Sequence, residues 1–103
     1  MKICIVAGKD SGNFPLVNII KALEKRKHHT NVVAIFNEFA HVRMFHQNGI
    51  QYFNVNDIHD YQEFLQGTEI CIVAENVFER DSDILKYIKE QGIFTITLAN
   101  LFG

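Results

Sequence analysis

Two glycines, a serine and an asparagine stand together near the amino terminus, between an apolar run and the first amphipathic segment. They belong to the hexapeptide Gly8-Lys9-Asp10-Ser11-Gly12-Asn13. Backbone amides in such a loop, at the positive end of the helix dipole that follows, are suited to bind a phosphate or a carboxylate. We therefore predict that the loop binds an anionic small molecule through Gly8, Lys9, Ser11, Gly12 and Asn13.

The loop matches neither of the two common phosphate-binding motifs. A dinucleotide-binding Gly-x-Gly-x-x-Gly pattern that begins at Gly8 would need glycines where Asp10 and Asn13 stand. The Gly-Lys-Ser/Thr of a Walker loop is absent from this segment. The alternative to a binding loop is a turn that only connects a strand to a helix.

The spacing of apolar residues predicts the elements that position this loop. Short apolar runs are typical of strands buried on both faces of a parallel sheet, and they occupy residues 2–7, 31–36, 69–74 and 93–98. Residues 50–55 predict a further strand, which is more polar and is expected at the edge of the sheet. Apolar residues at three- and four-residue spacing predict a helix from Pro15, capped by Asn13, and further helices over 39–47, 58–65 and 81–91. Glycines at 49, 67 and 92 are the predicted stops of the last three helices.

This alternation predicts an α/β, Rossmann-like three-layer sandwich with a five-stranded parallel sheet, formed by residues 1–103 as a single domain. The first and fourth strands are the most apolar and should be central, which gives the order 3-2-1-4-5. Such sheets bind ligands beyond the carboxyl ends of their strands, where the order reverses. Residues that follow the other strands should therefore line the same crevice, namely Asn37, Glu38, Glu75, Asn76 and Asn100.

Composition excludes several classes of function. With 103 residues, 48% of them apolar, and a net charge of -2, the chain is a folded domain without the basic excess of a nucleic-acid-binding protein. No apolar run reaches the roughly 18 to 20 residues that span a bilayer, and the start does not resemble a signal peptide, so we expect no membrane partner. Cys4 and Cys71 lie within apolar runs, which predicts buried reduced thiols and a cytoplasmic location.

Histidines and phenylalanines give weaker signals. No histidine pair has the spacing of metal ligands with a supporting Cys, Asp or Glu, so we predict no metal site. Most phenylalanines are predicted to be core residues. Four of them fall near strand ends, where the alternative to packing in the core is to line a pocket or a partner surface, namely Phe14, Phe39, Phe78 and Phe102.

Most of the chain resembles the amino-terminal half of the folate-dependent formyltransferases. Residues 5–14 are similar to that family's first strand and its Ser/Gly/Asn loop, and residues 32–37 are similar to its second strand, which also ends in asparagine. Gly49-Ile50 resembles the Gly-Ile-Pro segment that precedes the third strand in this family. Residues 93–102 fall where the family carries its Asn-x-His-Pro-Ser-Leu-Leu-Pro signature.

The resemblance departs from the family at the catalytic positions. Thr95 and Thr97 stand where the asparagine and histidine would polarise the formyl group and shuttle protons. Threonine cannot act as an acid near neutral pH, and the family's later aspartate and folate-binding segment have no counterpart in the 103 residues. The resemblance therefore implies a transferase-related domain that is inactive alone.

A second resemblance is to the amino-terminal, acceptor-side domain of two-domain GT-B glycosyltransferases. It rests on the loop from Gly8, on Pro15 opening the helix, and on the basic helix end Lys25-Arg26-Lys27-His28. If the chain is active, these resemblances imply a formyl- or glycosyltransferase, with a folate derivative or a nucleotide as cofactor. The third hypothesis is a non-catalytic ligand-binding or self-assembling module. The expected partners are a small anionic ligand and either a second copy of the chain or a carboxy-terminal half on another chain.

Overall fold

The strands β1 (Lys2–Ala7) and β4 (Thr68–Ala74) form the interior pair of a parallel sheet. The strand β2 (His29–Ala34) pairs with the other side of β1, while β3 (Phe53–Asn54) and β5 (Phe94–Leu98) lie at the two edges. These elements come from a computed structural model, which describes residues 1–7, 13–35, 39–74 and 83–98. The order β3-β2-β1-β4-β5 confirms the predicted α/β, Rossmann-like fold and the central position of the two most apolar strands.

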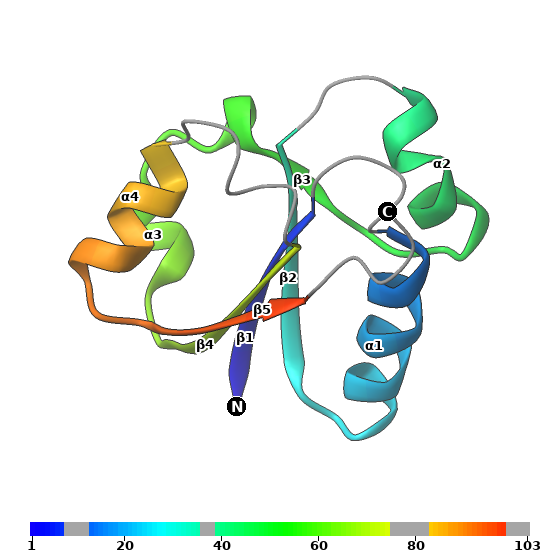
Figure 1. Cartoon of the computed structure of the whole chain (residues 1–103), viewed down its shortest axis with the longest axis horizontal. Coiled ribbons are helices and arrows are strands. Elements are labelled where there is room, and N and C mark those ends of the chain that lie inside the picture. The colour runs from blue at the N-terminus through cyan, green and yellow to red at the C-terminus, as the bar shows by residue number, and fades with distance from the viewer. Residues whose placement is uncertain (8–12, 36–38, 75–82, 99–103) are drawn as a thin grey trace.

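Helices cover both faces of the sheet (Figure 1). The helices α1 (Asn13–Lys25) and α2 (Phe39–Gln47) lie on one side, and α3 (Tyr61–Leu65) and α4 (Asp83–Glu90) lie on the other. Strands that alternate with helices must be parallel, because each helix returns the chain to the end of the sheet where the previous strand began. The two helical layers place the sheet in the interior of the domain.

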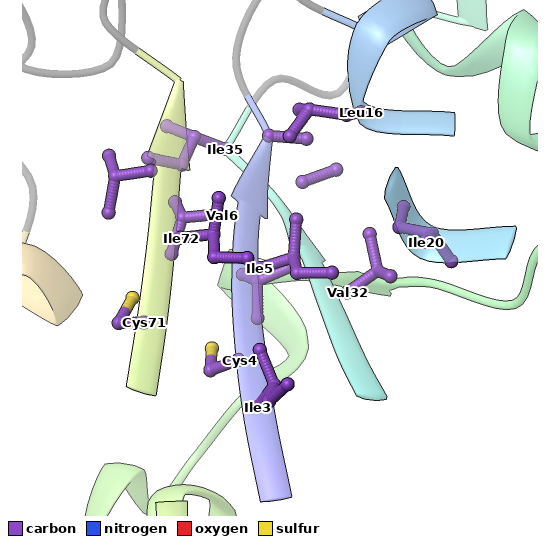
Figure 2. Close-up of a cluster of buried hydrophobic side chains, with 14 of the residues drawn as sticks. Ile3, Cys4, Ile5, Val6, Leu16, Ile20, Val32, Ile35, Cys71 and Ile72 are labelled. Atoms are coloured by element: carbon purple, nitrogen blue, oxygen red, sulfur yellow. The ribbon is translucent and has the colours of Figure 1, made fainter. Parts of the chain in front are cut away.

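The core forms on both faces of the central strands (Figure 2). On one face, Ile5 of β1 and its neighbour Val32 of β2 lie beside Leu16 and Ile20 of α1. Each of these four side chains is at most 2% exposed. Apolar residues four apart in α1 lie on one side of the helix, which explains why its apolar stripe faces the sheet.

Three helices end in the same backbone motif. After α2 and α4, Gly49 and Gly92 take positive φ angles of 65° and 68°, and the following amides, of Ile50 and Ile93, donate back into the last turn. After α1 the same position is held by Lys27, whose φ is 65°. Glycine takes this left-handed conformation without steric strain, whereas lysine does not. The predicted glycine stops are thus confirmed, and α1 ends without one.

The segment after α2 differs from the prediction. The expected strand over 50–55 is limited to Phe53 and Asn54, because the side chain of Asn54 accepts a 2.9 Å hydrogen bond from the amide of Asn56 and begins a 3-10 turn, Val55–Asp57. The predicted helix over 58–65 begins only at Tyr61, since Asp60 caps it. In this segment, hydrogen bonds between side chains and the backbone replace part of the predicted strand and the first turn of the predicted helix.

Two phenylalanines predicted to be core residues are exposed. Phe53 is 41% exposed and Phe94 is 66% exposed, and they lie on the two edge strands. Phe45 of α2 is fully buried, as predicted. The four strand-end phenylalanines have side chains outside the described part of the chain.

Candidate functional site

Four strands end at one edge of the sheet, and this edge is the candidate binding surface. Since β1, β2, β4 and β5 are parallel, their last residues, Ala7, Ala34, Ala74 and Leu98, lie at the same edge. The ends of β1 and β2 are held together, because the amide of Ile35 donates a 3.1 Å hydrogen bond to the carbonyl of Ala7. The segments that the sequence singled out for ligand binding all leave from this edge.

The direction of the crossovers reverses between β1 and β4. The chain that leaves β1 continues into α1 on one face, and the chain that leaves β4 continues into α4 on the opposite face (Figure 1). In open α/β sheets the loops separate at this point, and a crevice forms beyond the strand ends. The predicted order is therefore confirmed at the place where it matters for binding, between β1 and β4.

Of the predicted site residues, Asn13 alone belongs to a described element, as the first residue of α1. It begins the helix, where the sequence predicted the cap just before the first turn. The other nine lie outside the described residues: Gly8, Lys9, Ser11, Gly12, Asn37, Glu38, Glu75, Asn76 and Asn100. Their assignment to the site remains a prediction, supported by the strand ends from which their segments leave.

The start of α1 has the electrostatic character that an anion requires. This helix is 13 residues long, has no acidic residue in its first turn and has Lys25 in its last turn. A helix of this length carries a partial positive charge at its amino end, and a carboxylate in the first turn would neutralise it. The first turn of α1 therefore contributes no negative charge at the carboxyl edge of the sheet.

The two cysteines are structural and lie away from this edge. Cys4 and Cys71 are both fully buried free thiols on the sheet face opposite α1 (Figure 2). A hydrogen bond with the thiol of Cys71, and then burial, raise the pKa of the Cys4 thiol well above its usual range. A thiol that stays protonated is a poor nucleophile, so Cys4 is not activated as a catalytic cysteine.

A cavity between α4 and β5 was not predicted from the sequence. It has a volume of about 200 Å³ and is lined by Val73, Leu85, Ile88, Lys89, Thr95 and Thr97. The hydroxyl of Thr95 donates a 3.1 Å hydrogen bond to the carbonyl of Ile93. The formyltransferase resemblance aligned these two threonines with catalytic residues, and in the structure they lie within β5, on the face that α4 covers. The sequence did contain one signal for this arrangement, because residues at i and i+2 of a strand lie on the same face.

Two further findings concern metals and membranes. Within residues 1–7, 13–35, 39–74 and 83–98, no three His, Cys, Asp or Glu side chains come together in a group that could hold a metal ion. None of the helices in the same part of the chain combines the length and the apolar character that a bilayer-spanning helix needs.

Comparisons with known proteins do not assign the chain to a family. No family model matches the sequence. No curated protein matches it at a significant level either.

Proposed function

We propose that this chain is a transferase-related, Rossmann-like domain that binds a small molecule bearing a phosphate or carboxylate. The binding site is the crevice beyond the carboxyl ends of β1 and β4, with the anionic group at the amino end of α1. The observation that carries the proposal is the reversal of crossover direction between β1 and β4. A location in the cytoplasm is supported by the two free thiols.

The proposed ligand contacts follow from the segments that leave this edge. Backbone amides of the segment 8–13, with the side chains of Ser11 and Asn13, donate to the anion. Asn37, Glu38, Glu75, Asn76 and Asn100 bind the rest of the molecule. Several of these side chains are amides or carboxylates, which suits a ligand with hydroxyl or amino groups next to its charge, such as a folate derivative or a nucleotide.

Titration calorimetry with three probes tests this site: inorganic phosphate, a nucleoside diphosphate and a formyl-folate. We expect at least one of them to bind, and Ser11→Ala and Asn13→Ala each to weaken it about 5- to 10-fold, since each removes one hydrogen bond to a charged group. The matched control is Lys25→Ala, at the other end of α1, which should leave the affinity unchanged. Binding that is insensitive to both loop variants would contradict the proposal.

The proposed role is binding without turnover by this chain alone. The hydroxyls of Thr95 and Thr97 are too weakly acidic and too weakly basic near neutral pH to supply the acid or the base that acyl or glycosyl transfer requires. We expect no product above background when the purified chain is mixed with a formyl-folate donor and an amine acceptor. Robust formyl transfer in that assay would show that the chain has catalytic groups other than these two threonines.

A second candidate function, a non-catalytic module that assembles with itself, is favoured by one observation. Phe94 and Ile96 are exposed on an edge strand of the sheet, at 66% and 40% respectively. Assembly through this edge is compatible with ligand binding at the carboxyl edge, because the two surfaces involve different residues.

A further inference from the structure

Along one row of residues across the sheet, the side chains become more exposed toward β5. Ile5, Ile72 and Ile96 are neighbours across β1, β4 and β5, and they share the face on which α1 lies. Their exposed fractions rise outward from 0% to 8% to 40%. In the next row the exposure of Phe94 reaches 66%. Phe94 and Ile96 thus form an exposed apolar strip on this face of β5, while on the other face Leu85 and Ile88 of α4 line the cavity beside Thr95 and Thr97.

Within the described part of the chain, β5 lacks the sequence features that usually prevent edge strands from pairing. Its sequence, Phe-Thr-Ile-Thr-Leu, contains no charge and no proline, and its register with β4 runs without a bulge over all five residues. The opposite edge of the sheet differs. There β3 is two residues long, and Phe53 packs edge-on against Phe64 with ring centroids 5.2 Å apart. Long, uncharged and apolar edges pair readily with another strand.

The residues of β5 are complementary to themselves when the strand is reversed. Antiparallel pairing centred on Ile96 places Phe94 opposite the partner's Leu98, Thr95 opposite the partner's Thr97, and Ile96 opposite its own copy. Apolar side chains then meet apolar ones on the open face, and threonines meet threonines on the α4 face. A two-fold axis normal to the sheet generates this arrangement and keeps each face on its own side.

We propose that β5 is the interface between two copies of this chain, whose β5 strands pair antiparallel about a two-fold axis at Ile96. The pairing joins two five-stranded sheets into one continuous sheet and covers Phe94 and Ile96 of both copies. It also extends the cavity beside Thr95 and Thr97 with the partner's threonines, because both α4 helices lie on the same face. The partner is a second copy, since the strand's own sequence supplies the complement on both faces.

Sedimentation of the full chain over a range of concentrations tests the interface. We expect a monomer–dimer equilibrium that Ile96→Lys weakens at least about 100-fold, because two like charges then meet at the axis. Ile96→Val is the matched control and should retain the dimer. Circular dichroism and thermal unfolding establish that Ile96→Lys still folds, which its 40% exposure favours. Phosphate or nucleotide affinity should not change, so failure of this interface is distinguishable from failure of the ligand site.

Cysteine cross-linking tests the register and remains informative if Ile96→Lys fails to fold. Directly opposite residues of antiparallel strands have Cα atoms about 4.5 to 5.5 Å apart, which a disulfide can bridge. Ile96→Cys should therefore link to itself under mild oxidation. Phe94→Cys alone should not, but should link to Leu98→Cys when the two variants are mixed. The native Cys4 and Cys71 are both 0% exposed and should not contribute.

Three results would overturn the proposal. The first is a monomer at the highest concentrations reached. The second is a dimer that Ile96→Lys does not weaken and Ile96→Cys does not link, which would place the interface elsewhere. The third is a monomer in which the Ile96→Cys thiol resists alkylation in the native state, which would show that another segment of the same chain covers β5.

Discussion

Cys4 of β1 and Cys71 of β4 are directly paired in the central register of the sheet, and both thiols are fully buried on the face opposite α1 (Figure 2). The thiolate of Cys4 is unfavourable here, because an ionised sulfur would lose its hydration. The hydrogen bond between the two thiols and their burial together raise the pKa of Cys4 well above its ordinary value of 9.0.

This shift predicts a loss of stability at alkaline pH. In the unfolded chain the thiol ionises near pH 9, whereas in the folded chain it stays protonated to a higher pH. The contribution of the protonated Cys4 thiol to the free energy of unfolding is therefore complete below about pH 9. Above that pH it decreases, by up to roughly 1.4 kcal/mol per pH unit. Urea unfolding between pH 8 and 10 should show this decline, and Cys4→Ala should flatten it. An equal decline in both proteins would assign it to other groups.

Replacing Lys27 by glycine should stabilise the protein. Lys27 holds φ at 65° in the turn that ends α1, where Gly49 and Gly92 hold the same conformation after α2 and α4. Lys27→Gly removes this strain and should raise the free energy of unfolding by about 1 kcal/mol.

The reverse substitution at a glycine stop is the control. A Cβ at Gly92 would meet no atom within 4 Å, so Gly92→Ala introduces the left-handed strain without a clash. It should lower the free energy of unfolding by about 1 kcal/mol. If Lys27→Gly destabilises the protein, the turn after α1 depends on the lysine side chain instead.

Phe45 of α2 is the largest fully buried side chain among the described residues, and it should be the most sensitive position of this core. Phe45→Ala should lower the free energy of unfolding by about 3 to 5 kcal/mol, because the lost ring leaves a cavity. Tyr52, whose ring centroid lies 5.8 Å from that of Phe45, provides the control. Tyr52→Phe removes only the 3.0 Å contact of its hydroxyl with Nε2 of His46 and should cost about 1 kcal/mol or less. Comparable losses for the two variants would contradict a core role for Phe45.

Side-chain hydrogen bonds stabilise both ends of the short helix α3, and the interactions at each end should contribute about 1 kcal/mol to the free energy of unfolding. At its start Asp60 accepts a 3.2 Å hydrogen bond from the amide of Glu63. At its end the ammonium of Lys2 donates to the carbonyls of Phe64 and Gln66, at 3.2 and 2.6 Å. Chemical unfolding of Asp60→Ala and Lys2→Met should each show a loss of this size.

An exposed position within α3 separates these end effects from a general sensitivity of the helix. Gln62→Ala changes a residue in the middle of α3 that is exposed, and it should be neutral or slightly stabilising because alanine favours helices. A loss from Gln62→Ala as large as that from Asp60→Ala would mean that the cap is not what stabilises the helix.

Local chemistry limited the prediction in the segment between α2 and β4. Ile50 to Val55 is apolar enough to be read as a full strand, but the carboxamide of Asn54 begins a 3-10 turn and leaves two residues of β3. Asp60 then delays the start of α3 to Tyr61. Both residues act over two or three positions by accepting a backbone hydrogen bond, an effect that competes with hydrophobic spacing.

The sequence by itself determined the number and order of the strands, their parallel direction and the burial of both cysteines, because apolar periodicity and crossover handedness are properties of the chain. The tertiary structure decided what covers each strand. Phe45 and Phe94 are the same residue type and both were predicted to be core residues, yet one is 0% and the other 66% exposed. Burial of a strand residue depends on which helix, distant in the sequence, lies over it, and on this face no described helix buries the side chains of β5.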